Sequence, residues 1–323
     1  MHDGAMRAAS VLFASTLVVL AACSSAGGTP SNAFPDGASG SSAGGGSIVG
    51  GGGAGGTKAM GAGGSGILGA TGGASGATDP CGDVGKRVYV VSSNDELVSF
   101  DPQTLSFALI GKIKCPSGGH PFSMAVDRTG LAFVLFDDGN IFWVSTADAS
   151  CKASGYQPGQ QGFSQFGMGY VSDAVGSTAE TLYVIDDGAQ GLASIDHQGQ
   201  LKKIGQFDKL AAKSGEVTGT GDGRLFGFFV DITDPSKTSV AEIDKTNAKV
   251  ISNVPQSLPT INAWAFAHWG GSFYLFDGTG SESSRVDKFT PGKGTMNVVA
   301  NAGYRIVGAG VSTCAPTKEP TPG

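Results

Sequence analysis

One pattern occurs five times along this chain. Each copy has an apolar run with an aromatic residue at its third position, then a polar turn, then a second apolar run that ends in Asp, Ser or Thr. A short third run follows each copy. The aromatic residues are 43 to 50 residues apart, and they are Tyr89, Phe133, Tyr183, Phe226 and Tyr274. Short strands repeated at this period are typical of the blades of a β-propeller.

Runs of small residues complete the pattern. They precede four of the copies, as in SMAVDRTG and EVTGTGDG, but Cys81-Gly82 leads straight into the first copy. The missing run appears at the other end of the chain, from Tyr304 to Thr313. The sequence therefore predicts an all-β, five-bladed β-propeller with four-stranded blades, in which the C-terminus supplies the inner strand of the first blade. Glycines suit the crowded centre of such a ring, and the recurrent aromatics suit the packing between blades.

The N-terminus predicts export. Arg7 precedes an apolar run, Val11 to Leu20, that is too short to span a bilayer as a mature helix. It ends in Leu20-Ala21-Ala22-Cys23, which resembles a bacterial lipoprotein signal in which Cys23 becomes the lipidated first residue. The alternative is an ordinary secretory signal with a chance cysteine. Because Ser24 is not acidic, the expected location is the outer membrane or cell surface, with the membrane as a partner through the lipid anchor.

A glycine-rich segment separates this signal from the repeats. Twenty-one of the residues from Ser24 to Asp79 are glycine, mixed with Ser, Ala and Thr. Such a segment cannot bury enough apolar surface to fold, and as a coil it would reach roughly 40 Å. The predicted organisation is a signal peptide at 1–22, a lipidated and disordered tether at 23–80, the propeller at 81–315 and a disordered tail at 316–323.

Four further cysteines predict two disulfides in an exported domain. Cys314 follows the last inner strand and Cys81 precedes its neighbour, so this pair would lock the ring. By elimination Cys115 pairs with Cys151, although the predicted strand boundaries place these two towards opposite edges of adjacent blades.

The segments VYVVSSNDELVSFDPQTLSF, CPSGGHPFSMAVDRTGLAF and QQGFSQFGMG carry a resemblance. The first resembles repeats of quinoprotein-like and lactonase-like propellers. Together with the lipoprotein signal and tether, the other two resemble lipoproteins of myxobacteria. The resemblance implies the propeller fold and brings no activity, and no cofactor or metal residue of those enzymes can be matched in this sequence.

Several motifs have plain explanations. The G-x-S-x-G pattern at Gly40–Gly44 lies in the tether, without the strand and helix that a nucleophile needs. His197 is expected at a solvated turn, and His268 to be a structural histidine near the channel. His120 precedes the inner strand of the second blade, on the face where propellers usually bind. The net charge of −6 and the lack of a basic cluster argue against a nucleic-acid partner.

Acidic residues recur in the loops between the second and third strands of the blades, which share a face with the loops that lead into the inner strands. Repeated carboxylates attract cations, and calcium or a basic partner is one hypothesis. The alternative is that each Asp serves its own turn. The candidate binding rim consists of His120, Asp95, Asp137, Asp138, Asp186, Asp187, Asp231 and Asp277.

Two classes of function follow. The first is a monomeric binding or scaffolding lipoprotein of the cell envelope, with no cofactor, whose partner is an envelope protein or glycan. The second is a metal-dependent hydrolase or lyase with its site at the channel entrance. Few His and Glu residues lie in the loops leading into the inner strands, which favours the first. Three or more carboxylates or imidazoles that converge within metal-binding distance at the channel mouth would favour the second.

Overall fold

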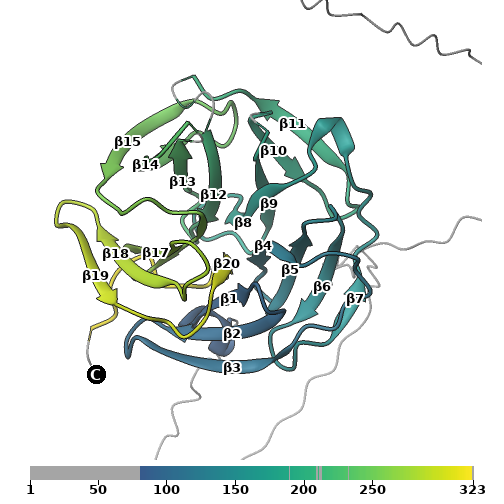
Figure 1. Cartoon of the computed structure of the whole chain (residues 1–323). Coiled ribbons are helices and arrows are strands. Elements are labelled where there is room, and N and C mark those ends of the chain that lie inside the picture. Colours follow the sequence, from purple (N-terminus) through teal and green to yellow (C-terminus); the bar gives the residue numbers. More distant parts are fainter. Residues whose placement is uncertain (1–80, 189, 209, 211–212, 232, 322–323) are drawn as a thin grey trace, which may run out of the picture. The chain divides into compact units, whose positions relative to one another are not determined.

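The computed structural model describes residues 81–188, 190–208, 210, 213–231 and 233–321. The predicted signal, Cys23 and the tether lie outside these residues. Five four-stranded antiparallel sheets form a ring, which confirms the predicted five-bladed β-propeller (Figure 1). Two short 3-10 helices, η1 (Gly82–Lys86) and η2 (Gln160–Gly162), accompany them. Among the described residues, no helix has the length and apolarity needed to cross a bilayer.

Each sheet is one blade, with its strands in order from the centre of the ring outwards. The first blade contains β20 (Ile306–Gly310), β1 (Val88–Ser92), β2 (Glu96–Asp101) and β3 (Ser106–Lys112). The second contains β4 (Pro121–Val126), β5 (Leu131–Phe136), β6 (Ile141–Ser145) and β7 (Cys151–Ala153). The third contains β8 (Phe166–Ser172), β9 (Glu180–Asp186), β10 (Leu192–Ile195) and β11 (Leu201–Gly205). The fourth contains β12 (Lys213–Gly219), β13 (Leu225–Asp231), β14 (Asp234–Ile243) and β15 (Val250–Gln256). The fifth contains β16 (Ala263–Trp269), β17 (Ser272–Gly278), β18 (Arg285–Thr290) and β19 (Gly294–Val299).

The inner strands meet around the axis of the ring. β4, β8, β12, β16 and β20 contact one another between sheets. Glycines permit this approach, because a Cβ at Gly169 would lie 2.6 Å from the carbonyl oxygen of Val217 on the neighbouring blade. A Cβ at Gly308 would likewise lie 2.8 Å from Cα of Ser123. The small-residue runs of the sequence are therefore the strands that share the crowded centre.

The hydrophobic core consists of layers between neighbouring blades. Five buried clusters each join side chains of two adjacent blades. The recurrent aromatics take part in them, as predicted. Phe133 of the second blade contacts Tyr170 of the third at 5.4 Å between ring centroids, and Tyr274 of the fifth contacts Phe100 of the first at 5.4 Å. Each blade therefore packs on both of its neighbours around the closed ring.

The C-terminal strand closes the ring. β20 pairs antiparallel with β1, with Tyr89 opposite Gly310. A disulfide between Cys81 and Cys314, with the Cα atoms 5.6 Å apart, joins the segments that flank this pair. The order of strands confirms the prediction that the far end of the chain completes the first blade.

The second disulfide, Cys115–Cys151, also forms, with a Cα–Cα distance of 5.3 Å. The predicted boundaries put these cysteines at opposite edges of adjacent blades, and the structure corrects this placement. The outer strand β3 lies against the turn before the outer strand β7, because a Cβ at Gly111 would be 3.2 Å from Cβ of Ala149. Both cysteines therefore belong to the outer edges of the first two blades.

Residues 316–321 differ from the disordered tail expected there. The backbone N–H of Gly270 donates to the carbonyl oxygen of Pro316 at 2.7 Å. Lys288 Nζ lies 3.9 Å from Glu319 Oε1. Both glycines of the β16–β17 turn have positive φ, 62° at Gly270 and 74° at Gly271, and a Cβ at Gly271 would be 3.1 Å from the carbonyl oxygen of Thr317. The turn has no side chains, so the tail can lie directly on it.

The two faces of the ring differ. The mouth face is the face on which the inner strands begin, with residues such as Arg305 and Ala263. On the opposite face, where the inner strands end, Trp269 Nε1 donates to the carbonyl oxygen of Gly85 at 3.0 Å. Cys81 and Cys314 lie beside this contact, since Gly85 also packs on Cys314. The chain therefore enters the propeller at Cys81 on the face opposite the mouth.

Candidate binding site at the mouth of the ring

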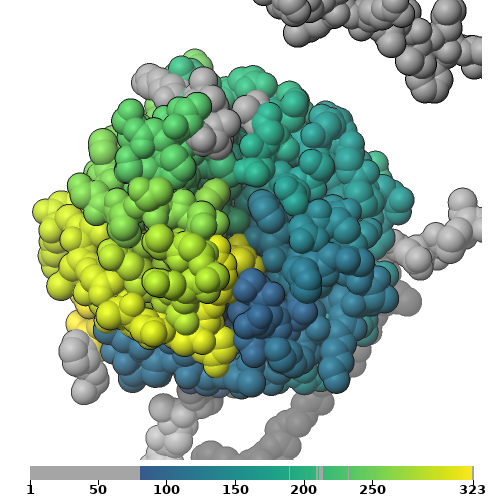
Figure 2. Space-filling model, in the orientation of Figure 1, coloured from purple at the N-terminus to yellow at the C-terminus, as the bar shows by residue number. Residues whose placement is uncertain are grey.

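A cavity of about 210 Å³ lies on the mouth face, and the space-filling view shows a hollow near the centre of the ring (Figure 2). All five blades line it, mainly with residues at the start of the inner strands. Its charged and aromatic lining residues are Phe122, Asp137, Asp187, Glu216, Trp264 and Arg305. The cavity exists only because the ring closes, so no single repeat of the sequence contains it.

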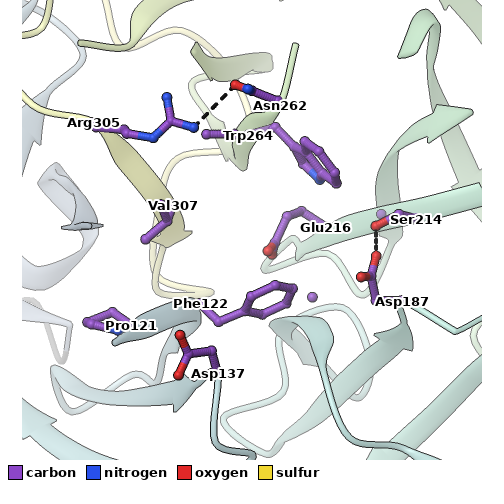
Figure 3. Close-up of a pocket in the computed structure, with 13 residues that line it drawn as sticks. Pro121, Phe122, Asp137, Asp187, Ser214, Glu216, Asn262, Trp264, Arg305 and Val307 are labelled. Carbon is purple, nitrogen blue, oxygen red and sulfur yellow. Dashed lines mark hydrogen bonds between the residues drawn. The ribbon is translucent and has the colours of Figure 1, made fainter. Parts of the chain in front are cut away.

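Glu216 on β12 lines the cavity and lies between Arg305 and Asp187 in the close-up view (Figure 3). Glu216 is 3% exposed, and its Oε2 accepts a hydrogen bond from the Ser123 hydroxyl at 2.8 Å. The backbone N–H of Met168 donates to the same Ser123 hydroxyl at 3.2 Å. Burial, with a further contribution from the charge of Asp187, raises the pKa of Glu216 well above its usual value.

Glu216 should therefore make the protein less stable as the pH rises. Its pKa in the folded chain exceeds the ordinary value of 4.5, so ionisation favours the unfolded state. Its stabilising contribution is complete below pH 4.5 and is lost as the pH rises towards the folded pKa, at up to about 1.4 kcal/mol per pH unit. Glu216→Gln is expected to melt at a higher temperature than the wild type at pH 8 and at the same temperature at pH 4.

Thermal melting followed by circular dichroism across this pH range measures the effect. Glu282→Gln, at an exposed loop position of the fifth blade, is the matched control and should melt like the wild type throughout. Burial also raises the pKa of Glu180 to about 7. Because the wild type and Glu216→Gln both contain Glu180, its contribution cancels from the difference between their melting temperatures. Equal melting of Glu216→Gln and wild type at pH 8 would show that the pKa of Glu216 is not raised in the folded protein.

Arg305 supplies positive charge to the cavity. Its Nη2 donates to Asn262 Oδ1 at 3.2 Å, while its Nη1 is buried and has no hydrogen-bond partner among the described residues. No described carboxylate forms an ion pair with it. A guanidinium that is partly removed from water without a counter-charge is costly, which makes Arg305 a candidate ligand-binding residue.

Two of the predicted rim residues, Asp137 and Asp187, line the same cavity. Asp137 Oδ1 accepts a hydrogen bond from the backbone N–H of His120 at 3.1 Å. Asp187 Oδ1 accepts one from the Ser214 hydroxyl. In neither residue does the second carboxyl oxygen accept a hydrogen bond from a described residue, and neither carboxylate has an ion-pair partner within that part of the chain.

A third predicted acid, Asp95, contacts His120, with 3.0 Å between Oδ1 and Nδ1. The hydrogen bond and the negative charge of Asp95 raise the pKa of this exposed histidine. The structure thus brings His120, Asp95 and Asp137 to neighbouring positions on the mouth face, of which only Asp137 lines the cavity.

The other predicted acids are held within their own loops or blades. Asp138 accepts hydrogen bonds from Ser117, Gly118 and Asn140. Partial burial opposes its ionisation, but these bonds prevail and lower its pKa to about 2. Asp186 is 2% exposed and accepts from the Gln190 N–H at 3.0 Å, and Asp231 accepts from Thr233 at 2.7 Å.

Asp277 is also buried, at 1% exposure, and lies 3.4 Å from Nε of Arg285. Burial, reinforced by the neighbouring Asp287, raises its pKa to about 8. Among the described residues, no three His, Cys, Asp or Glu side chains converge so that they could hold a metal ion.

Of the remaining histidines, His197 is exposed at its turn. His268 is 5% exposed and stacks on Phe226 with 6.4 Å between centroids. Burial lowers its pKa to about 4, so it is neutral over most of the physiological range. His268 is not among the residues that line the cavity.

Comparisons with known proteins found similarity in structure and none in sequence families. No protein-family model matches the chain, and no curated protein matches it in sequence. A protein of unknown function from Bacteroides caccae is 10% identical, with a TM-score of 0.40 over 69% of this chain and 97% of that one. Kuenenia stuttgartiensis hydrazine synthase is 14% identical, with a TM-score of 0.38 over 67% and 64%. The Dos1 propeller is 13% identical, with a TM-score of 0.38 over 71% of each chain.

Proposed function

We propose that this chain is an exported, lipid-anchored protein of the cell envelope whose β-propeller binds a small polar ligand in the central cavity. The observation that carries the binding role is the convergence of Arg305, Asp137, Asp187 and the buried Glu216 on one cavity lined by all five blades. Concave sites with a few convergent polar groups among apolar side chains are the usual form of ligand pockets. Trp264 and Phe122 supply the apolar surface of this one.

Retention of ligand tests the binding role. The purified protein is incubated with a small-molecule extract of the envelope of the producing cell, washed by ultrafiltration and analysed by mass spectrometry. Wild type is expected to retain a compound that Trp264→Ala releases, because the indole borders the cavity. The control is Leu109→Ala, at a side chain that is 54% exposed on the outer strand β3. Identical retention by wild type and Trp264→Ala would contradict the proposal.

The proposed anchor is Cys23. Its support is the apolar run followed by Leu20-Ala21-Ala22-Cys23, together with two disulfides that suit an oxidising compartment. Cys23→Ser is expected to move most of the protein from the membrane fraction to the soluble exported fraction, as measured by cell fractionation. Ser24→Ala is the matched control and should stay in the membrane fraction. Unchanged dependence on detergent in the Cys23→Ser variant would contradict the lipid anchor.

Other parts of the prediction remain predictions. These are the outer-membrane location, the monomeric state, an envelope protein or glycan as partner, and calcium binding at the acidic rim. Most rim carboxylates already have local partners, so the calcium hypothesis is not part of the proposed function.

A further inference from the structure

We propose that the ligand of the central cavity is a small zwitterion, such as a free amino acid, whose carboxylate contacts Arg305 and whose ammonium group contacts Asp137 and Asp187. This inference rests on the proposed binding function and names the chemistry of the ligand. It starts from the distribution of charge, because groups of opposite sign line the same cavity without pairing with each other.

The positive side of the cavity is formed by the first and fifth blades. Arg305 directly precedes β20 and bonds to the neutral side chain of Asn262, which precedes β16. A guanidinium offers five N–H donors in a planar fork that matches a carboxylate. With one side-chain bond to a neutral amide and no described counter-ion, Arg305 keeps capacity for an anionic group.

The negative side is formed by the second and third blades. Asp137 and Asp187 occupy the loops that follow β5 and β9, across the cavity from Arg305 (Figure 3). Each accepts one hydrogen bond through Oδ1, from the His120 backbone and the Ser214 hydroxyl respectively. An ionised carboxylate has about four acceptor positions, so both can still accept hydrogen bonds from an ammonium group.

Ligands of a single charge fit this arrangement less well. A simple cation would be attracted to the two carboxylates but repelled by Arg305, and a simple anion would meet the reverse. A neutral sugar could hydrogen-bond to all three groups but would leave each charge without a counter-charge as water leaves the cavity. A zwitterion matches both sides at once.

The rest of the cavity limits the size and nature of the ligand body. Its volume of about 210 Å³ lies below the ~300–1,000 Å³ typical of sites for drug-sized molecules. Phe122 and Trp264 offer aromatic surface to an apolar side group. Glu216 lies between the charged sides, and as a neutral acid it would add a hydrogen-bond donor without changing the balance of charge.

Calorimetric titration of the full chain in detergent micelles tests the inference. The probes are glycine, L-alanine, L-leucine and L-phenylalanine, with L-leucinamide, N-acetyl-L-leucine and glucose as comparisons. At least one amino acid is expected to bind, and L-leucine should bind at least tenfold more tightly than its amide, which lacks the carboxylate, and than its acetyl derivative, which lacks the ammonium group.

Two sets of variants assign the charges. Arg305→Gln should make L-leucine and L-leucinamide bind alike, whereas Asp137→Asn with Asp187→Asn should remove the preference for L-leucine over N-acetyl-L-leucine. The matched control is Asp234→Asn with Lys237→Gln, an exposed ion pair at 3.0 Å outside the cavity, which should leave every affinity unchanged. Melting curves of each variant establish that it is folded.

The outcomes separate this inference from the proposed function. Failure of all four amino acids to bind, or equal binding of L-leucine and its singly charged derivatives, overturns the zwitterion. If wild type still retains an envelope compound that Trp264→Ala releases, the cavity binds a ligand of another class and the proposed function stands. If nothing is retained either, both are wrong.

Discussion

Deletion of residues 304–323 is expected to abolish cooperative folding of the propeller. The deletion removes β20, whose Ile306 and Ala309 are at most 1% exposed, and it opens the inner edge of β1. Burial of one Ile or Val contributes about 1.5–3 kcal/mol, and the net stability of a domain is only about 5–15 kcal/mol. The loss of a strand and of the closing disulfide is therefore comparable to the whole stability. The exposed edge of β1 should also promote aggregation.

Size-exclusion chromatography and thermal melting measure the result. A shorter deletion, of residues 316–323, is the matched control, because it keeps β20 and Cys314 and removes only the segment on the Gly270–Gly271 turn. This control should remain a folded propeller with a modestly lower melting temperature. A soluble, cooperatively melting protein after deletion of 304–323 would contradict the role of β20 in closing the ring.

Removal of the Cys81–Cys314 disulfide is expected to cost more stability than removal of the Cys115–Cys151 disulfide. The first joins residues 233 positions apart and the second residues 36 positions apart. In the chain-entropy model these loops correspond to about 5 and about 4 kcal/mol of the free energy of unfolding. Cys81→Ser with Cys314→Ser should therefore unfold at a lower urea concentration than Cys115→Ser with Cys151→Ser.

The location of the two bonds reinforces this difference. Cys81–Cys314 holds the segments that flank the β1–β20 pair, whereas Cys115–Cys151 joins the outer edges of two blades that are consecutive in the chain. Urea unfolding followed by tryptophan fluorescence gives both midpoints. A larger loss in the Cys115–Cys151 variant would mean that the first two blades depend on this staple more than the ring depends on its closure.

The fold was predictable because each repeat carries its own evidence. The aromatic residues at Tyr89, Phe133 and Tyr274 mark the same register in different blades, and the missing inner strand of the first blade has a match near Tyr304. The spacing of the repeats and their order along the chain can be read directly from the sequence. The Cys115–Cys151 pair was placed less well, because it depends on how closely two outer strands approach each other.

The candidate site was predictable only in part. Asp137 and Asp187 were expected on the mouth face, and they line the cavity. Glu216 and Arg305 were not singled out, since each comes from a different blade and neither belongs to a motif. A lone Glu within a run of small residues, EVTGTGDG, was the available signal for Glu216. Which acids face a ligand and which serve their own turns depends on side-chain partners that spacing along the chain does not reveal.

The position of Cys81 gives the ring a direction. The chain enters the propeller on one face, and the cavity opens on the other. If Cys23 is the lipid anchor, as we propose, the anchored segment joins the ring on the face opposite the opening of the cavity. A ligand would then reach the cavity without displacing the anchor, so the proposed binding and the proposed attachment would use opposite poles of the propeller.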